Sequence, residues 1–478
     1  MREPRGPYIS GGMTMSTDAA ATETTAPRSA LVGWAMFDWA GQPFYTLVQT
    51  FLFAPYFANV VVADPMKGQA AWGYAAAFAG ALVAIGSPIL GAVADSGGRR
   101  KPWVGLFGLM LVIGLCLLWL ATPKLEGWVF YLVLAGYALA FAGSEFAAVF
   151  NNAIMPTLVR SDQLGRLSGI GWGLGYAGGL LSLAIVAGFI VTDPANGLTM
   201  FGLNPLLPLD SAAREGDRLV GPFSALWFIV FVIPFFLFVP DHRTAVRGGA
   251  SATPIRDALA SLWNTVRNLP NDRNILWMLI GRMLYADGLA AIFVFGGIYG
   301  ASVFGWRTFD LGLFGIILAA TGAVGAVIGG LLDDRIGAKS VIVGSIVILL
   351  IGFFGILSVD KGHVLFVVPI AEKAVGSAAF SSSGEQIFLA FSILIGLVAA
   401  PVQAAGRSLL ARLAPPELMT QYFGLFAFSG KATAFAAPLM IAVVTTMTGS
   451  QRWGIAATAL FLIGGLIFML PVKEPRRG

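Results

Sequence analysis

The chain has 478 residues, of which 57% are hydrophobic and only 12% are charged. Soluble globular proteins carry about 25% charged residues, so the composition excludes an ordinary soluble enzyme and indicates a protein that crosses a membrane several times. The net charge of +5 is spread between apolar segments, which favours membrane topology over a nucleic-acid partner. Cys116 is the single cysteine and the two histidines, His242 and His363, fall in predicted loops. An intramolecular disulfide is therefore excluded, and we expect neither a metal site nor a cofactor.

Residues 1–30 are polar, rich in alanine, serine and threonine, and lack the apolar core of a signal peptide. We expect a disordered cytoplasmic tail there. About 20 apolar residues cross a bilayer as a helix, and the chain contains twelve such segments. To within a few residues they cover 31–62, 70–94, 103–121, 128–158, 164–192 and 221–240, then 273–304, 309–332, 340–358, 386–413, 417–447 and 452–472.

Most of the 30 Lys and Arg fall in alternate connections between these segments. Because basic residues stay on the cytoplasmic side, we predict a multi-pass protein of the inner (plasma) membrane with both termini in the cytoplasm. The predicted organisation is a tail (1–30), a six-helix bundle (31–240), a linker (241–272), a second six-helix bundle (273–472) and a short tail (473–478). The linker is expected to contain an amphipathic helix near 255–268, while 193–220 and 359–385 are expected to be outside inserts. The apolar piece 364–371 is too short to span and could be a surface or re-entrant segment.

An internal repeat links the two predicted halves. The loop GAVADSGGRRK (91–101) follows the second segment of the first half, and GLLDDRIGAKS (330–340) follows the second segment of the other half. At one constant offset, Gly91, Asp95, Gly98 and Arg100 align with Gly330, Asp334, Gly337 and Lys339. A repeat of this kind indicates duplication. Charged residues that pair in one arrangement of the halves and separate in another would form a conformational latch; the alternative is a simple turn with topogenic charges.

The pattern G-x-x-x-D-x-x-G-x-[RK] in these loops resembles the signature loop of the major facilitator superfamily, and residues 31–472 fit its twelve-helix plan. The resemblance implies an all-α membrane protein with two six-helix bundles around a central cavity, which opens alternately to either side. Segments 1, 4, 7 and 10 would line that cavity.

A narrower resemblance rests on three stretches: GWAMFDWAGQPFYTLVQTFLFAPYF (33–57), GRMLYADGLAAIFVFGGIYG (281–300) and GRSLLARLAPPELMTQYFGLFAFSGKATAFAAP (406–438). They look like the vacuole-effluxer branch, whose fungal members are similar to an autophagy-related vacuolar amino-acid exporter. The chain has Gly41-Gln42 where bacterial members often have Asn-Ser. The resemblance implies a cargo similar to amino acids.

Charged residues inside predicted spans are costly and face a bundle interior or a watery cavity. In the first segment, polar and aromatic residues recur every three or four positions and so share one helix face. We predict that this face lines the cavity; its members are Trp34, Asp38, Gln42, Tyr45 and Gln49. The first four are candidates for solute binding. Asp38 is either a solute contact or a proton-coupling carboxylate, and the competing interpretation is a static buried pair with Arg282 or Lys431.

The remaining candidates lie on segments 4, 7, 10 and 11. Glu145 and Asp287 are candidates for proton coupling, with fixed ion pairs as the alternative. Arg282, Tyr285, Asp287 and Gln403 are candidates for solute binding. Arg282 and Asp287 lie about 140° apart on one helix, so we expect Arg282 to meet a carboxylate on another helix. Lys431 is the candidate for a structural ion pair.

We therefore expect a secondary active transporter that moves a small polar or zwitterionic solute by alternating access, coupled to protons. The alternatives are a membrane solute receptor or sensor without transport, and a facilitator of another substrate class such as sugars, peptides or drugs. No P-loop is present, and no compact nucleophile or metal-ligand set indicates an enzyme. The expected partners are the lipid bilayer, the solute and protons, with no nucleic acid, and we expect a monomer.

Overall fold

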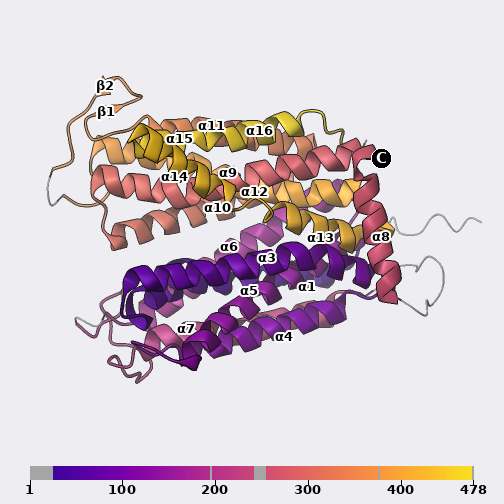
Figure 1. The fold of residues 1–478 in the computed structure, drawn as a ribbon, viewed down its shortest axis with the longest axis horizontal. Coiled ribbons are helices and arrows are strands. Elements are labelled where there is room, and N and C mark those ends of the chain that lie inside the picture. Colours follow the sequence, from indigo (N-terminus) through magenta and orange to yellow (C-terminus); the bar gives the residue numbers. More distant parts are fainter. Residues whose placement is uncertain (1–24, 194–195, 242–253, 375–376, 476–478) are drawn as a thin grey trace, which may run out of the picture.

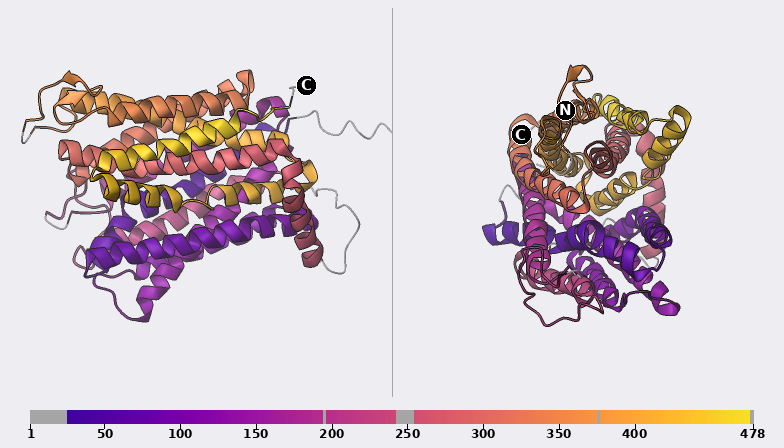
Figure 2. Two further views of the ribbon diagram at one scale, coloured as in Figure 1. Left: turned by 45° about the horizontal axis from the view of Figure 1, so that its top comes forward. Right: turned by 90° about the vertical axis from the view of Figure 1, so that its left-hand side faces the viewer.

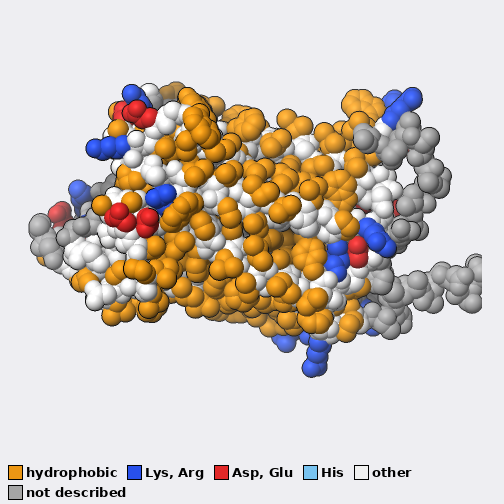
Figure 3. Space-filling view, turned by 90° about the horizontal axis from the view of Figure 1, so that it is seen from below, with side chains coloured by type: hydrophobic (Ala, Val, Ile, Leu, Met, Phe, Trp, Pro, Cys, Tyr) orange, Lys and Arg blue, Asp and Glu red, His pale blue; other side chains and the backbone are white. Residues whose placement is uncertain are grey.

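The computed structural model describes residues 25–193, 196–241, 254–374 and 377–475. Long helices lie side by side, and the connections gather at the two ends of the bundle (Figure 1). Apolar side chains cover the middle of the visible face, whereas charged side chains gather toward its ends (Figure 3). This distribution suits a body surrounded by hydrocarbon in its middle and by water at both ends. Most of the predicted N-terminal tail lies outside the described residues.

The first half of the chain begins with a helix that changes its hydrogen-bond pattern inside the span. Helix α1 (Arg28–Pro43) continues as a π-helical stretch, Phe44–Phe51, and ends in α2 (Phe53–Tyr56) and a second π-helical turn, Phe57–Val61. Pro43 has no N–H to donate, and wide turns of this kind are frequent at functional sites. The other helices of this half are α3 (Pro65–Gly97), α4 (Lys101–Leu117), α5 (Trp128–Ile154), α6 (Leu164–Phe189) and α7 (Glu215–Phe238).

The predicted amphipathic linker helix is present as α8 (Pro254–Asn268). The second half contains α9 (Arg273–Phe304), α10 (Thr308–Ile336), α11 (Ala338–Leu357), the short strands β1 (His363–Val364) and β2 (Val368–Pro369), α12 (Ser383–Leu413), α13 (Met419–Ser429), α14 (Ala436–Thr448), α15 (Gln451–Ala457) and α16 (Ala459–Met469). The strands pair as an antiparallel hairpin. Among the described residues, 11 helices are long and apolar enough to cross a membrane.

The continuous helix expected over 417–447 is instead divided into α13 and α14, with turns between Ser429 and Ala436. The segment is apolar enough to span, but its helix gives way to turns over residues 430–435. Hydrophobicity alone predicts the crossing and says little about such a break. The fold class is otherwise as predicted: an all-α membrane protein.

The helices before α8 and those after it form two groups that lie against each other (Figure 2). Helix α6 packs along α10, and α3 packs along α13, so each group contributes two helices to one seam. We call the end of the bundle crossed by α8 the α8 end, and the opposite end, which carries β1 and β2, the hairpin end (Figure 1).

Glycines allow close approach of backbones across the seam. A Cβ added at Gly91 would lie 2.5 Å from the carbonyl oxygen of Thr420, and one added at Gly330 would lie 2.7 Å from the carbonyl oxygen of Gly165. Both are the first glycines of the repeated loops, so the repeat places one tight helix contact in each half. Helices in membranes commonly associate through small residues of this kind.

Gly91→Val should therefore push α3 away from α13. Overpacking costs about 1–3 kcal/mol, and we expect a lower midpoint of thermal unfolding in detergent. Gly73→Val is a matched control, because a Cβ there meets nothing within 4 Å. Equal midpoints for the two variants would contradict the close contact.

Candidate transport site

Arg407 of α12 crosses the seam and is held by residues of three helices of the first half. Its Nη1 lies 3.1 Å from Oδ2 of Asp38 and donates to Oδ1 of Asn152 at 2.9 Å. Its Nε donates to Oγ of Ser168, and its Nη2 donates to the Ser168 carbonyl oxygen at 2.7 Å. The guanidinium also lies 4.9 Å from the ring centre of Trp34. We call these residues the Arg407 network.

The Arg407 network gives Asp38 a partner that the sequence does not predict. The predicted alternatives were Arg282 and Lys431, whereas the carboxylate pairs with Arg407 of the other half. The Arg407 side chain is 5% exposed and that of Asp38 is 19% exposed, so the pair is largely dry. Spacing places Arg407 one turn beyond Gln403 on the same stripe of its helix. The stripe therefore indicates that Arg407 faces the same side as Gln403. However, its position near the end of the predicted segment favours a role as a basic residue that sets membrane topology.

A second charged network lies about two turns further along the first span, at Tyr45 of the π-helical stretch that follows α1. Nζ of Lys431 lies 3.1 Å from Oε1 of Glu145, and the hydroxyl of Tyr45 donates to the same oxygen at 3.4 Å. Ser144 donates to the Tyr45 hydroxyl at 3.0 Å, and the Lys431 ammonium sits 5.0 Å from the ring centre of Phe141. We call these residues the Glu145 network.

The Glu145 network also joins the two halves, because Glu145 lies on α5 and Lys431 lies in the break after α13. Its ion pair is more open than the first: the Lys431 side chain is 30% exposed and that of Glu145 is 19% exposed. Lys431, the candidate for a structural ion pair, thus pairs with Glu145, the candidate for proton coupling. An ion pair with access to water can exchange its partners for a charged solute at lower cost than a dry one.

Arg282 of α9 stabilises the end of α13 rather than meeting the carboxylate that we expected. Its guanidinium lies 3.5 Å from the ring centre of Phe426, and its Nε donates to the Phe426 carbonyl oxygen at 3.2 Å. A Cβ added at Gly430 would lie 3.0 Å from Nη2 of Arg282. A cation at a helix C-terminus is favourable, because unpaired carbonyls there carry partial negative charge.

Asp287 lies on the other side of the same break. It is 3% exposed, and the Thr433 hydroxyl is its polar neighbour. Thr433 precedes the start of α14, where partial positive charge favours a carboxylate. Arg282 and Asp287 therefore lie beside opposite sides of the break, both from α9, and they do not pair with each other.

The other predicted solute-binding residues are dispersed around these networks. Gln42 packs against α6, with Oε1 3.3 Å from a Cβ added at Gly175. Tyr285 is 1% exposed, and its hydroxyl lies 2.7 Å from a Cβ added at Gly406, next to Arg407. Gln403 is half-buried on α12. The helix 1 face predicted from spacing thus splits into two levels, one at Asp38 and one at Tyr45.

The first repeated loop contacts the other half at the α8 end. Oδ2 of Asp95 accepts a hydrogen bond from the backbone N–H of Gln421 at 2.8 Å, and Oδ1 accepts one from Thr420 at 3.2 Å. Asp95 therefore caps the first turn of α13, where free N–H groups favour a carboxylate. Arg100 pairs with Asp95 at 3.4 Å and donates to Oγ1 of Thr420 at 2.8 Å. Gly98 ends α3 with a φ of 76°, which a glycine adopts at low cost.

The second repeated loop makes the equivalent contact with α6. Oδ1 of Asp334 accepts from the backbone N–H of Arg166 at 3.1 Å, and the Arg166 side chain lies 3.5 Å from Oδ2. Gly337 has a φ of 97° and makes the turn into α11, as Gly98 does into α4. Lys339 behaves differently from the residue with which it aligns: it donates to the Leu470 carbonyl oxygen within its own half. It corresponds to Lys101, which donates to Phe236 and Val239, rather than to Arg100.

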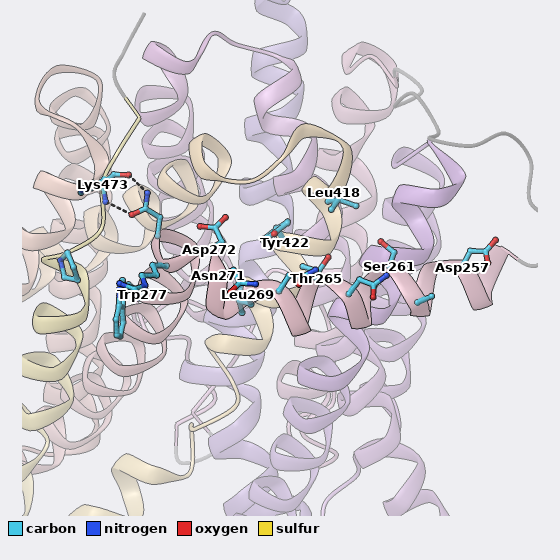
Figure 4. A pocket seen from close by; sticks show the side chains of 16 residues that line it. Asp257, Ser261, Thr265, Leu269, Asn271, Asp272, Trp277, Leu418, Tyr422 and Lys473 are labelled. Atoms are coloured by element: carbon cyan, nitrogen blue, oxygen red, sulfur yellow. Dashed lines mark hydrogen bonds between the residues drawn. The ribbon is translucent and has the colours of Figure 1, made fainter.

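A cavity of about 1250 Å³ lies at the α8 end, outside the predicted site. It is an open hollow bordered by α8, the start of α9, and residues near Tyr422 and Lys473 (Figure 4). The side chains along α8 that line it are mostly polar, and they include Asp257, Ser261 and Asn264. The cavity thus occupies one side of the linker helix.

The sequence is similar to that of a known family of membrane proteins. The family model described as "Vacuole effluxer Atg22 like" matches residues 65–477. The uncharacterized MFS-type transporter YxiO of Bacillus subtilis (strain 168) is 24% identical over 452 residues, which are 92% of this chain and 94% of that protein. Autophagy-related protein 22 of Cryptococcus neoformans var. neoformans serotype D (strain B-3501A) is 24% identical over 310 residues, which are 64% of this chain but only 52% of that protein.

Solved structures show the same fold at low sequence identity. The major facilitator superfamily transporter FucP in the outward conformation aligns with a TM-score of 0.66 and 14% identity, covering 94% of this chain and 99% of that one. The human organic anion transporter MFSD10 (TETRAN) aligns with a TM-score of 0.64 and 15% identity, covering 92% and 99%.

Proposed function

This chain belongs to the Atg22-like vacuole effluxer family of the major facilitator superfamily, and from that premise we propose that it moves a small zwitterionic solute, similar to an amino acid, by alternating access coupled to protons. The membership confirms both resemblances read from the sequence. The chain is a multi-pass membrane protein and a transporter of the major facilitator type. Solute class, coupling and membrane orientation are our proposal.

The Glu145–Lys431 pair carries the proposal on solute class. It is a half-open ion pair between the two halves, with a carboxylate on one side and an ammonium on the other. A zwitterion offers the complementary charges, so its ammonium could replace Lys431 beside Glu145 while its carboxylate binds Lys431. Arg282 lies on the same side of the break as a second cation for a carboxylate or phosphate.

The contacts between the two halves lie toward the α8 end, which indicates where the halves would separate during transport. The contacts of Asp95 and Asp334 join the halves at the α8 end, and the Arg407 network adds a third junction. Breaking these contacts would let that end open. We propose that a proton on Glu145, Asp38 or Asp287 shifts the equilibrium between the two states, because protonation removes a charge from a buried contact. We propose that the α8 end faces the cytoplasm of a cell with an inner (plasma) membrane, because the positive-inside rule favours that orientation.

Flux measurement tests the proposal. Purified protein in liposomes should take up or release labelled neutral amino acids under an imposed proton gradient, and a protonophore should abolish the gradient-driven part. Sugars, peptides and organic anions form the comparison panel. Binding of solutes without flux in any direction would favour a receptor or sensor, and flux restricted to an uncharged sugar would overturn the assignment of a zwitterion.

A further inference from the structure

Helix α8 has an exposed apolar side that faces away from its contacts with the bundle. Ala258 is 2% exposed and Thr265 is 9% exposed, so these residues mark the side packed against the protein. In contrast, the exposed fractions are 44% for Leu259, 67% for Trp263 and 42% for Val266. At about 100° per residue these three residues fall within about 60° of one another. We call them the α8 stripe.

Basic and polar residues complete the circumference of α8 in a regular order. Arg256 and Arg267 are exposed and lie next to the stripe, about 20° apart on the helical wheel. Asp257 and Asn264 follow on the remaining side and line the polar cavity. The helix therefore has a protein side, an apolar side, a basic edge and a polar side.

The position of α8 in the fold indicates that the α8 stripe contacts the lipid bilayer. The helix runs across the end of the bundle, roughly perpendicular to the spanning helices, and lies at the edge of the molecule in Figure 1 and in the left view of Figure 2. It packs against α3, whose exposed Ile85 and Leu82 belong to the apolar belt. A helix at the edge of a membrane protein, level with the ends of its spans, lies at the boundary between hydrocarbon and head groups. Trp, with an apolar ring and one N–H, is enriched at that depth.

We propose that α8 is an in-plane membrane helix that inserts its stripe into the adjacent leaflet and binds anionic phospholipid head groups through Arg256 and Arg267. The pattern is typical of interfacial helices: a strong apolar side, a basic edge and low overall hydrophobicity. Charge complementarity selects anionic over zwitterionic lipid, since each basic side chain near an anionic surface contributes about 1 kcal/mol. This inference goes beyond the transport cycle and takes only the cytoplasmic orientation of α8 from the proposed function.

Bound lipid would act on the closed α8 end. Ser261 of α8 donates to Oε1 of Gln421 at 3.4 Å, and the backbone N–H of Gln421 donates to Asp95. Helix α8 also contacts α3, which carries Asp95. A helix fixed in the leaflet thus holds together the two elements that the first repeated loop joins, and anionic lipid should favour the closed α8 end.

Quenching by spin-labelled lipids tests where α8 lies. In a Cys116→Ser background, a fluorophore is attached to Leu259→Cys on the stripe or, as the matched control, to Asn264→Cys on the polar side. The full-length protein is placed in vesicles that contain phospholipid with a nitroxide high on the acyl chain. We expect strong quenching at position 259 and weak quenching at 264. Equal quenching at both positions would overturn the in-plane placement.

Lipid selectivity tests the basic edge. Quenching at 259 by nitroxide phosphatidylglycerol should exceed quenching by nitroxide phosphatidylcholine, and each Arg→Gln change at Arg256 and Arg267 should lower that preference by about fivefold. Lysine at both positions should keep the preference, and Arg99→Gln, at an exposed position in another loop, should leave it unchanged. A preference that survives loss of both arginines would overturn the head-group assignment. Spin labels at Arg99→Cys and Glu417→Cys test the coupling while a transported solute and a proton gradient populate both distances. Phosphatidylglycerol should then increase the share of the short-distance population relative to phosphatidylcholine, and no change would overturn the coupling.

Discussion

Replacing Arg407 with glutamine should destabilise the protein and open the α8 end. The substitution leaves Asp38, Asn152 and Ser168 without their shared cationic donor in a largely dry place. Removing one partner of a buried ion pair costs about 3–5 kcal/mol. We expect a clearly lower midpoint of thermal unfolding and a longer distance between spin labels at Arg99 and Glu417, which lie in different halves at that end.

Two further variants separate a specific role of Arg407 from a general loss of charge. Arg452→Gln removes a partly exposed arginine that pairs with Asp360 at 3.7 Å near the hairpin end, and exposed pairs contribute about 1 kcal/mol or less. Asp38→Asn combined with Arg407→Gln leaves no unpaired charge and should recover part of the lost stability. If Arg407→Gln were as stable as Arg452→Gln and kept the short label distance, the Arg407 network would not hold the halves together.

Glu145→Gln should strongly lower coupled transport of a zwitterion while the protein stays folded. The variant removes the charge that would bind the solute ammonium and that now pairs with Lys431. A hydrogen bond to a charged group contributes about 1.5–3 kcal/mol, so we expect transport to fall by roughly 10- to 100-fold. The measurement is the initial rate of labelled solute uptake into liposomes under a proton gradient.

Matched substitutions test whether the loss of uptake is specific to the Glu145–Lys431 pair. Glu126→Gln changes an exposed carboxylate in a loop and should leave uptake unchanged. Lys431→Gln removes the other half of the pair and should also lower uptake, with the larger effect on solutes that carry a carboxylate. Full uptake by Glu145→Gln and Lys431→Gln alike would place solute binding elsewhere, and the pair would then be structural only.

The fold class was predictable because membrane spans are recognised from local runs of apolar residues. Runs of apolar residues locate the spans, and the repeated glycine–aspartate loops reveal two related halves. The break after Ser429 was not predictable in this way, because an apolar run looks the same whether its helix is continuous or interrupted. Gly430 and Lys431 are the only local signs, and each is also found in unbroken helices.

For the candidate site, the sequence groups residues on helix faces but does not predict their partners on other helices. Helical spacing predicts that Asp38 and Tyr45 share one face of the first span, yet it cannot assign Arg407 to Asp38 or Lys431 to Glu145. Those contacts depend on how α12 and the α13–α14 break pack across the seam. The paired residues are far apart in the sequence, and helical periodicity gives no information on contacts between different helices. For the same reason the sequence predicts that Arg282 meets a carboxylate, whereas its Nε donates to the Phe426 carbonyl oxygen.

The distance across the α8 end, measured while solute is moved, tests alternating access most directly. Spin labels at Arg99→Cys and Glu417→Cys in a Cys116→Ser background report the separation of the halves in liposomes. Without solute, the structure predicts one short-distance population, held by Asp95, Asp334 and Arg407. Adding a transported solute with a proton gradient should create a second, longer population, which Glu145→Gln should suppress. A single unchanged distance under conditions that support flux would contradict the account.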